Sequence, residues 1–383
     1  MNSYKKPIIY FKKLIEKEIN YASVKPTQAL LIMTYRCTSQ CKLCTIWMKG
    51  KKIDKKKELT LDDWKKCIDM LNPMDLKFIE IFGGDSLLRK DVTIPLIDYI
   101  KKSNKNIIVE LPTNCNLIDR KTVIALIKAG VDRLYISLDG PIEIHDKIRG
   151  TQGTYNNVQK AIQYFVEEKK NLKSKTPQII INCVISSNNV NEFERIIPIA
   201  KKLGVDVIEF EYVGEFKEDN IQNTNFDGIK PTPFYVNRSS SNLLNLEQAN
   251  LLKKKMKNIR ELANNLKMKI STSVIDALTI ENLVNGTIPN KKCYICRCLV
   301  TIDPFGNVIC CTHYNNYFFG NIKKETLSSI RKNNKFRSFL NSQKKGKIKI
   351  CENCVSGVNR NSTLFQTIYR DIYFRFEGKG FDE

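Results

Sequence analysis

This 383-residue sequence lacks any long apolar run. No stretch of about eighteen apolar residues occurs, so we expect no membrane span. Residues 1–18 are basic and broken by charged side chains, without the continuous apolar core of a secretory signal peptide. Both absences argue against a membrane-spanning or secreted protein and predict a cytoplasmic one.

Acidic side chains are scarce as well. The chain has 40 Asp and Glu against 63 Lys and Arg, which gives a formal net charge of +23. A basic surface of this kind suits a polyanion such as nucleic acid. The lysines are spread over the whole chain, however, and they accompany an excess of Asn and Ile. We therefore attribute them to compositional bias and solvated lysine faces, and expect no nucleic-acid partner.

Cysteine, by contrast, occurs thirteen times. Cys37, Cys41 and Cys44 follow the apolar run at 30–33, and their close spacing lets one loop fold around a single metal centre. Structural zinc usually takes four protein ligands, whereas three thiolates leave one iron of a four-iron cluster open for chemistry. The loop therefore favours a [4Fe-4S] cluster. A zinc loop that borrows a distant fourth ligand is the alternative.

The first two thirds of the chain alternate strand and helix patterns, which predicts an α/β fold. Apolar runs predict buried strands at 30–34, 78–82, 106–111, 133–138, 179–185 and 205–212. Helical patterns lie between them at 61–71, 94–102, 120–129, 155–168 and 191–203. Such alternation predicts a parallel sheet curled into a partial (β/α)6 TIM-like barrel, with its site at the carboxyl ends of the strands.

Polar and glycine residues follow successive predicted strands, as a site at that rim requires. In chain order, these residues are Gly83, Gly84, Asp85, Asn114, Ser137 and Asp139. Each motif alone would be an ordinary turn. Their occurrence at three successive strand exits after the cysteine loop predicts one shared site.

A second cysteine group lies in the last third of the chain. Its members are Cys293, Cys296, Cys298, Cys310, Cys311, Cys351 and Cys354. Two β-branched runs joined by the turn at 303–306 predict a hairpin between the third and fourth of them. The most economical ligand set is Cys293, one of Cys310 or Cys311, Cys351 and Cys354. A zinc ribbon is the alternative use of such pairs.

The cysteine loop and the strand-exit motifs resemble those of radical S-adenosylmethionine enzymes over about the first 190 residues. The resemblance implies a [4Fe-4S] cluster on Cys37, Cys41 and Cys44 whose open iron binds S-adenosylmethionine. Its reduction, by a flavodoxin- or ferredoxin-type donor, would cleave the sulfonium to a 5′-deoxyadenosyl radical that abstracts hydrogen from a substrate.

The resemblance also implies the contacts to S-adenosylmethionine. Gly83, Gly84 and Asp85 stand where the family has Gly-Gly-Glu, and the acid would accept from the ammonium group. Three further assignments complete the set. They are Asn114, in a turn where Cys115 replaces glycine; Ser137 and Asp139, for the ribose; and Arg149, for the methionine carboxylate.

The carboxyl-terminal cysteines resemble the SPASM and twitch extensions of the same enzymes, which hold auxiliary iron-sulfur clusters. Because no cysteine follows Cys354, we expect one auxiliary [4Fe-4S] cluster. The spacing of Cys293, Cys296 and Cys310 is similar to the auxiliary site of molybdopterin-precursor cyclases. Cys296 and Cys298 therefore stay alternative ligands.

We divide the chain accordingly into six parts. They are a basic amino-terminal extension (1–26), the core barrel (27–213), a polar loop and candidate lid (214–245), a helical connection (246–290), the small cysteine-rich α+β domain (291–358) and an aromatic-rich tail (359–383).

Only about thirty residues precede Cys37, which leaves no room for a peptide-binding domain. We therefore expect an oxidoreductase or modifying enzyme that acts on a small molecule such as a sugar derivative. The alternatives are a maturase of a ribosomally made peptide and a non-catalytic zinc or iron-sulfur binding protein.

Overall fold

The computed structural model describes residues 26–74, 76–234, 242–286, 293, 295–352 and 354. The predicted tail at 359–383, almost all of the amino-terminal extension and parts of the lid and of the helical connection lie outside the described residues. None of the described helices is both long and apolar enough to cross a membrane.

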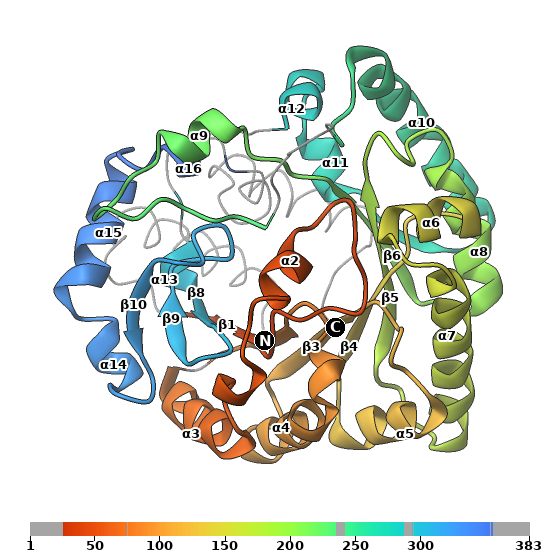
Figure 1. Cartoon of the computed structure of the whole chain (residues 1–383). Helices are drawn as coiled ribbons and strands as arrows, with labels where there is room; N and C mark the ends of the chain where they lie inside the picture. Colours follow the sequence, from red (N-terminus) through yellow and green to blue (C-terminus); the bar gives the residue numbers. More distant parts are fainter. Residues whose placement is uncertain are drawn as a thin grey trace, which may run out of the picture.

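One ten-stranded sheet organises the described residues, in the order β10-β9-β8-β1-β2-β3-β4-β5-β6-β7 (Figure 1). Its strands are β1 (Gln28–Ile32), β2 (Phe78–Phe82), β3 (Ile108–Thr113), β4 (Arg133–Ser137), β5 (Gln178–Ile185), β6 (Val207–Tyr212), β7 (Lys269–Ser271), β8 (Leu299–Ile302), β9 (Asn307–Ile309) and β10 (Phe318–Asn321). The strands from β8 to β7 in that order run parallel, and the pairs β8·β9 and β9·β10 are antiparallel.

Helices α3, α4, α5, α7 and α8 range around the outside of the curled sheet (Figure 1). The helices of the barrel part are α2 (Ile46–Gly50), α3 (Leu61–Leu71), α4 (Lys90–Ser103), α5 (Arg120–Ala129), α6 (Ile142–Arg149), α7 (Thr154–Asn171) and α8 (Ile196–Leu203). Later in the chain follow α9 (Glu218–Gln222), α10 (Leu246–Asn265), α11 (Ser273–Ala277), α12 (Ile280–Asn285), α13 (Ile295–Cys298), α14 (Leu327–Ile330), α15 (Asn334–Lys344) and α16 (Lys349–Glu352). Short 3-10 turns occupy Lys55–Lys57, Asn72–Met74, Ser86–Arg89 and Phe193–Arg195.

Local signals in the sequence explain several helix ends. Thr60 caps α3 through a reciprocal pair of hydrogen bonds with Asp63, so this helix has the predicted bounds. Gly130 and Gly204 end α5 and α8 with positive φ angles of 89° and 79°, a conformation that glycine adopts without strain. The observed α8 begins at Ile196, five residues after the predicted start, because a 3-10 turn precedes it.

Alternating burial along the strands separates two faces of the sheet. Ile79 and Ile81 of β2 are fully buried and pack into the large core between sheet and helices, whereas Glu80 between them is only half-buried. On β1, Leu30 and Ile32 belong to a second, smaller apolar core that also contains Tyr35. We call this second group of side chains the inner core.

Two features extend the predicted six-stranded barrel. The three-residue strand β7 adds a seventh parallel strand beside β6. On the other side, β8 of the predicted hairpin pairs in parallel with β1, with Gln28 opposite Leu299. The cysteine-rich part therefore continues the barrel sheet. Neither pairing has a local sequence signal. Strand β7 is too short for a periodic pattern, and the pairing of β1 with β8 joins strands that are distant in the chain.

A strap follows α9 and joins the barrel to the cysteine-rich part. We define the strap as residues 223–234, which lie inside the predicted lid. The hydroxyl of Tyr317 donates to Asp227 Oδ2 at 2.6 Å, and the Asn315 side chain donates to the carbonyl of Thr232 at 2.5 Å. At its other end the carbonyl of Phe234 accepts from the amide and the hydroxyl of Thr45, at 2.7 and 2.6 Å.

Candidate functional site

The loop with Cys37, Cys41 and Cys44 begins at the carboxyl end of β1, and all three thiols are half-buried and free. Burial raises the pKa of the Cys37 thiol to about 11 and that of the Cys44 thiol to about 12. A bound cationic metal centre stabilises thiolates against this burial cost, which fits this donor set. Within the described ranges no three His, Cys, Asp or Glu side chains lie close enough together to bind a single metal ion. A four-iron cluster does not require this, because each thiolate binds a different iron.

Gly83 and Gly84 allow the chain after β2 to pass against the start of the cysteine loop. The amide of Gly84 donates to the carbonyl of Thr34 at 2.9 Å, and the amide of Asp85 donates to that of Arg36 at 2.8 Å. A Cβ atom on Gly84 would lie 2.2 Å from the Arg36 carbonyl oxygen. The glycines are thus required by the protein's own backbone.

Replacing Gly84 by Ala should displace the cysteine loop, because the added methyl group meets backbone atoms that cannot rotate away. We expect a loss of about 1–3 kcal/mol in the free energy of unfolding and a lower iron content per chain. Thermal unfolding and iron analysis measure both. Gly153→Ala is the control: no atom lies within 4 Å of its Cβ position, so it adds only the backbone strain of a φ of +80°, about 1–2 kcal/mol, and should leave the iron content unchanged. Equal effects of the two variants would contradict this packing argument.

Asp85 and Asn114 are brought together with the cysteine loop. The hydroxyl of Thr38 donates to Asp85 Oδ2 at 2.7 Å and accepts from the Asn114 amide at 2.9 Å. Asn114 Nδ2 also lies 3.8 Å from Cys37 Sγ. Burial raises the pKa of the Asp85 carboxyl, while the hydrogen bond from Thr38 opposes that shift. Two predicted site residues therefore contact the cysteine loop directly.

Sequence reasoning missed the hydroxyl and amide groups that complete this network. Thr38 and Ser39 lie inside the cysteine loop, and Asn116 Nδ2 donates to Ser39 Oγ at 3.0 Å. Asn116 in turn accepts from Asn157 Nδ2 at 3.2 Å. Two hydroxyl residues between the first two cysteines were the available signal for this network.

Asp139 follows β4 and is completely buried. Its Oδ2 lies 2.7 Å from Arg149 Nη2, and its Oδ1 accepts from the amide of Val184 at 3.3 Å. Burial raises the pKa of the Asp139 carboxyl, but Arg149, His145 and the Val184 amide together hold it below the usual value. Both Asp139 oxygens are thus engaged within the protein, so its contact to a ribose stays a prediction. Ser137 ends β4 beside Asn182 and is half-buried.

The second cysteine group lies around β8 and β9. Cys298 directly precedes β8, and its carbonyl accepts from the amide of Thr27 before β1. The cysteine loop instead follows the carboxyl end of β1, so Cys298 and that loop lie toward opposite ends of the parallel strands. Cys44, Cys293 and Cys311 all pack against the inner core.

Interactions within the second group distinguish its members. Burial and the neighbouring thiols of Cys296, Cys354 and Cys311 raise the pKa of Cys293. Burial likewise raises the pKa of Cys351, beside Cys293 and Cys311. The thiol of Cys310 interacts with those of Cys296 and Cys311 and lies 3.2 Å from the carbonyl of Tyr314. Six members thus neighbour one another, and they are Cys293, Cys296, Cys310, Cys311, Cys351 and Cys354.

Charged side chains occupy the half-buried face of the sheet. Glu80, Glu110 and Arg133 are register neighbours on β2, β3 and β4, and Arg133 pairs with Glu110 at 3.1 Å. On β6, burial and the charges of Glu211 and Glu110 raise the pKa of Glu209 to about 7. The interior of the barrel is therefore polar and rich in carboxylates, in contrast to the apolar inner core beneath the cysteine loop.

The raised pKa of Glu209 predicts a pH-dependent stability. Its folded pKa of about 7 exceeds the ordinary value of 4.5, so the fold favours the protonated form. Stability should therefore fall as pH rises from about 5 to 8, by about 3 kcal/mol at most for this one group. Thermal unfolding across this pH range should show that Glu209→Gln flattens the decline, whereas Glu261→Gln on the exposed face of α10 leaves it unchanged. An unchanged slope in Glu209→Gln would refute the assignment.

Comparison with protein families agrees with this geometry. Residues 31–197 match the radical SAM superfamily, and residues 293–355 match the SPASM iron-sulfur cluster-binding domain. The chain belongs to the radical SAM superfamily, whose members are enzymes. Within that superfamily it is a member with a carboxyl-terminal SPASM domain. Radical SAM domains bind a [4Fe-4S] cluster and S-adenosylmethionine, and SPASM domains indicate auxiliary iron-sulfur clusters, so the predicted family, fold and cofactors are confirmed.

Relatives of known activity match only parts of the chain. Fe-coproporphyrin III synthase of Methanosarcina barkeri is 29% identical over 157 residues, which are 41% of this chain and 38% of the relative. PqqA peptide cyclase of Bradyrhizobium diazoefficiens is 28% identical over 187 residues, 48% of this chain and 46% of the relative. The matched region spans about half the length of these relatives or less.

Solved structures match nearly the whole chain. Native anSMEcpe with bound AdoMet has a TM-score of 0.61 at 17% identity, covering 91% of this chain and 96% of that one. Streptococcus suis SuiB bound to its precursor peptide SuiA has a TM-score of 0.62 at 15% identity, covering 94% and 79%. At these identities the likeness concerns the fold.

Proposed function

We propose that this radical SAM enzyme takes hydrogen from a small organic molecule, such as a sugar derivative, and thereby oxidises or modifies it. The observation that carries the choice of substrate is the strap. Its hydrogen bonds join Thr45, one residue after Cys44, to the cysteine-rich part through Phe234 and Thr232. A strap fixed on both sides of the strand exits favours a compact substrate over a folded macromolecule.

The residues of the chain divide the work in this proposal. Cys37, Cys41 and Cys44 would hold the cluster, which together with S-adenosylmethionine supplies one-electron cleavage of the sulfonium and hydrogen abstraction. Asp85 and Asn114 would orient S-adenosylmethionine from their places beside Thr38. Ser137 and Asp139 stay candidates for the ribose. The inner core packs against Cys44 and would limit the access of water to that side of the cysteine loop.

For the auxiliary cluster we propose Cys293, Cys311, Cys351 and Cys354 as ligands. The supporting observation is that the thiols of Cys293, Cys311, Cys351 and Cys354 interact with one another. Cys310, which also interacts with Cys296 and Cys311, stays an alternative, as do Cys296 and Cys298. Four ligands suffice for one cluster, so the proposal includes a single auxiliary [4Fe-4S] cluster. A cytoplasmic location and a flavodoxin- or ferredoxin-type donor belong to the same proposal.

Anaerobic reconstitution with iron and sulfide tests the proposal. We expect about eight irons per chain and, under a strong reductant, conversion of S-adenosylmethionine to 5′-deoxyadenosine. Stoichiometric zinc without cleavage would instead support the non-catalytic zinc protein.

Hydrogen transfer identifies the substrate class. Cell extract from deuterated medium, separated into small-molecule and peptide fractions, should give deuterated 5′-deoxyadenosine with the small-molecule fraction alone. Label from the peptide fraction alone would support the peptide-maturation alternative. That alternative is favoured by the partial similarity to a peptide cyclase.

A further inference from the structure

The carboxyl end of α6 lies against the middle of the cysteine loop. The amide of Gln40 donates to the carbonyl of Arg149 at 3.1 Å, and the amide of Lys42 donates to that of Ile148 at 2.9 Å. Gly150 ends the helix with a φ of +61°, and a Cβ atom there would lie 2.4 Å from the Gln40 carbonyl oxygen. The segment between Cys37 and Cys44 is therefore bound to the end of one helix.

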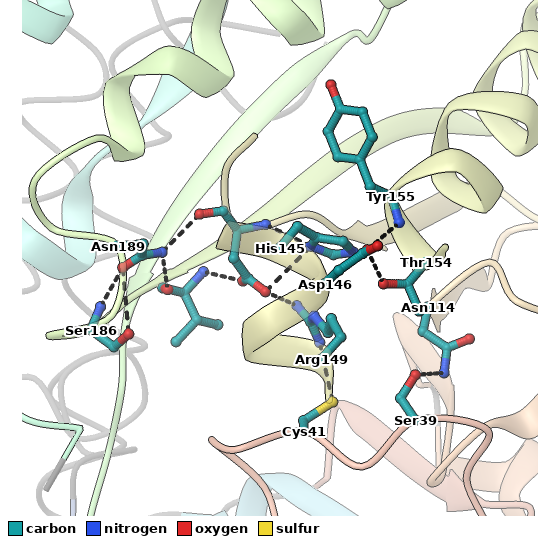
Figure 2. Close-up of polar contacts among 12 residues, drawn as sticks. Ser39, Cys41, Asn114, His145, Asp146, Arg149, Thr154, Tyr155, Ser186 and Asn189 are labelled. Atoms are coloured by element: carbon teal, nitrogen blue, oxygen red, sulfur yellow. Dashed lines mark hydrogen bonds and ion pairs between the residues drawn. The ribbon is translucent and has the colours of Figure 1, made fainter. Parts of the chain in front are cut away.

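The Arg149 side chain turns to the same loop. Its Nη1 donates toward Cys41 Sγ at 3.9 Å, within the range for a hydrogen bond to sulfur (Figure 2). Its Nη2 lies 2.7 Å from the buried Asp139, which fixes the guanidinium in this orientation. His145 Nδ1 accepts from the Asp139 amide at 3.2 Å, so the imidazole is neutral at this atom and Arg149 is the cation that neutralises Asp139.

Asn189 and Asp146 stabilise the positions of Asp139 and of helix α6, respectively. Asn189 Nδ2 donates to the carbonyl of Asp139 at 2.9 Å. Asp146 on α6 accepts from the amide of Tyr155 at 2.8 Å (Figure 2) and from the amide of Gly153 at 2.7 Å. These bonds fix α6 to the start of α7. The guanidinium thus has little freedom to leave the sulfur atom.

We propose that Arg149 positions and tunes the cluster itself. Its guanidinium donates a hydrogen bond to the Cys41 sulfur and thereby raises the reduction potential of the cluster. The proposal rests on the assignment of a cluster to Cys37, Cys41 and Cys44. Hydrogen bonds to ligand sulfurs and nearby positive charge both favour the reduced, more negative state of an iron-sulfur cluster. This role is distinct from the predicted contact of Arg149 with the methionine carboxylate, which would operate only when S-adenosylmethionine is bound.

The reduction potential measured without S-adenosylmethionine separates the two roles. In Arg149→Gln we expect the reduction equilibrium of this cluster to become at least tenfold less favourable, a shift of 59 mV to more negative potential for one electron. Electron paramagnetic resonance follows the titration. The signal of this cluster is the one absent from the triple variant with alanine at Cys37, Cys41 and Cys44. In Arg149→Lys, which keeps the charge, the shift should be smaller.

Arg195→Gln is the matched control. Arg195 is half exposed and pairs with Glu143 at the start of the same helix α6, so its loss removes one charge without touching the cysteine loop. Its potential should equal that of the wild type. An unchanged potential in Arg149→Gln with weaker binding of S-adenosylmethionine would overturn the proposal in favour of the carboxylate contact. Loss of the cluster from Arg149→Gln but not from Arg149→Lys would support it, and loss from both variants would overturn the tuning role. A wild-type protein without this cluster would refute the proposed function instead.

Discussion

Simultaneous replacement of Cys37, Cys41 and Cys44 by alanine should abolish cleavage of S-adenosylmethionine and remove about half of the iron, about four of eight atoms per chain. The loss is complete because these thiolates are the proposed protein ligands of the cluster that binds S-adenosylmethionine. The second cysteine group consists of thiols that neighbour one another, so it keeps its own ligands. Iron analysis and chromatography of 5′-deoxyadenosine measure the two effects.

The matched control is Cys67→Ala, which removes a thiol inside α3. That thiol packs in the large core, so iron and cleavage should be retained. Residual cleavage in the triple variant would contradict the assignment of the reactive cluster to this loop. Loss of all iron would show that the auxiliary cluster depends on the first one for assembly.

The second large effect is expected at Glu58, whose side chain is fully buried between two arginines. Its Oε2 lies 2.9 Å from Arg36 Nη2 and 3.0 Å from Arg89 Nη1, and the hydroxyl of Thr34 donates to Oε1. Arg36 directly precedes Cys37, and Thr34 lies three residues before it. Glu58→Ala would leave two partly buried guanidinium groups without their carboxylate, and we expect a loss of about 3–5 kcal/mol in the free energy of unfolding.

Denaturant unfolding of the variant measures this loss. The control is Glu143→Ala, because Glu143 is 57% exposed in its pair with Arg195 and a surface ion pair contributes about 1 kcal/mol or less. We also expect less iron in Glu58→Ala than in the control, since Thr34 and Arg36 lose their common anchor. Similar losses of stability in the two variants would show that burial does not strengthen the ion pairs of Glu58 with Arg36 and Arg89.

The barrel and its strand-exit motifs could be predicted because their signals are local. Thr60 with Asp63 marked the start of α3, and the run at 78–82 marked β2 to the residue. Asp85 and Asn114 could be placed near the cysteine loop because parallel strands bring their carboxyl ends to one rim.

Features that depend on distant partners could not be predicted. Glu58 follows a run of three lysines, a composition typical of a solvated surface. Charged residues are also seldom buried, so nothing local indicated that Glu58 is. Its burial follows from Arg36 and Arg89, which the sequence does not link to it. The ion pair between Asp139 and Arg149 was not predicted either. The sequence motifs assign Asp139 to a ribose and Arg149 to the methionine carboxylate, and the sequence does not link the two side chains.

The pairing of β1 with β8 has a consequence for the synthesis of the chain. Gln28 finds its neighbour Phe78 early, but its other neighbour, Leu299, is made only after the whole barrel. Until then β1, which carries the cysteine loop at its end, is an unprotected edge strand with exposed backbone groups and an uncovered inner core. A nascent chain that stops before Leu299 therefore offers a template for aggregation, and maturation of the reactive cluster in a stably folded barrel waits for the last third of the protein.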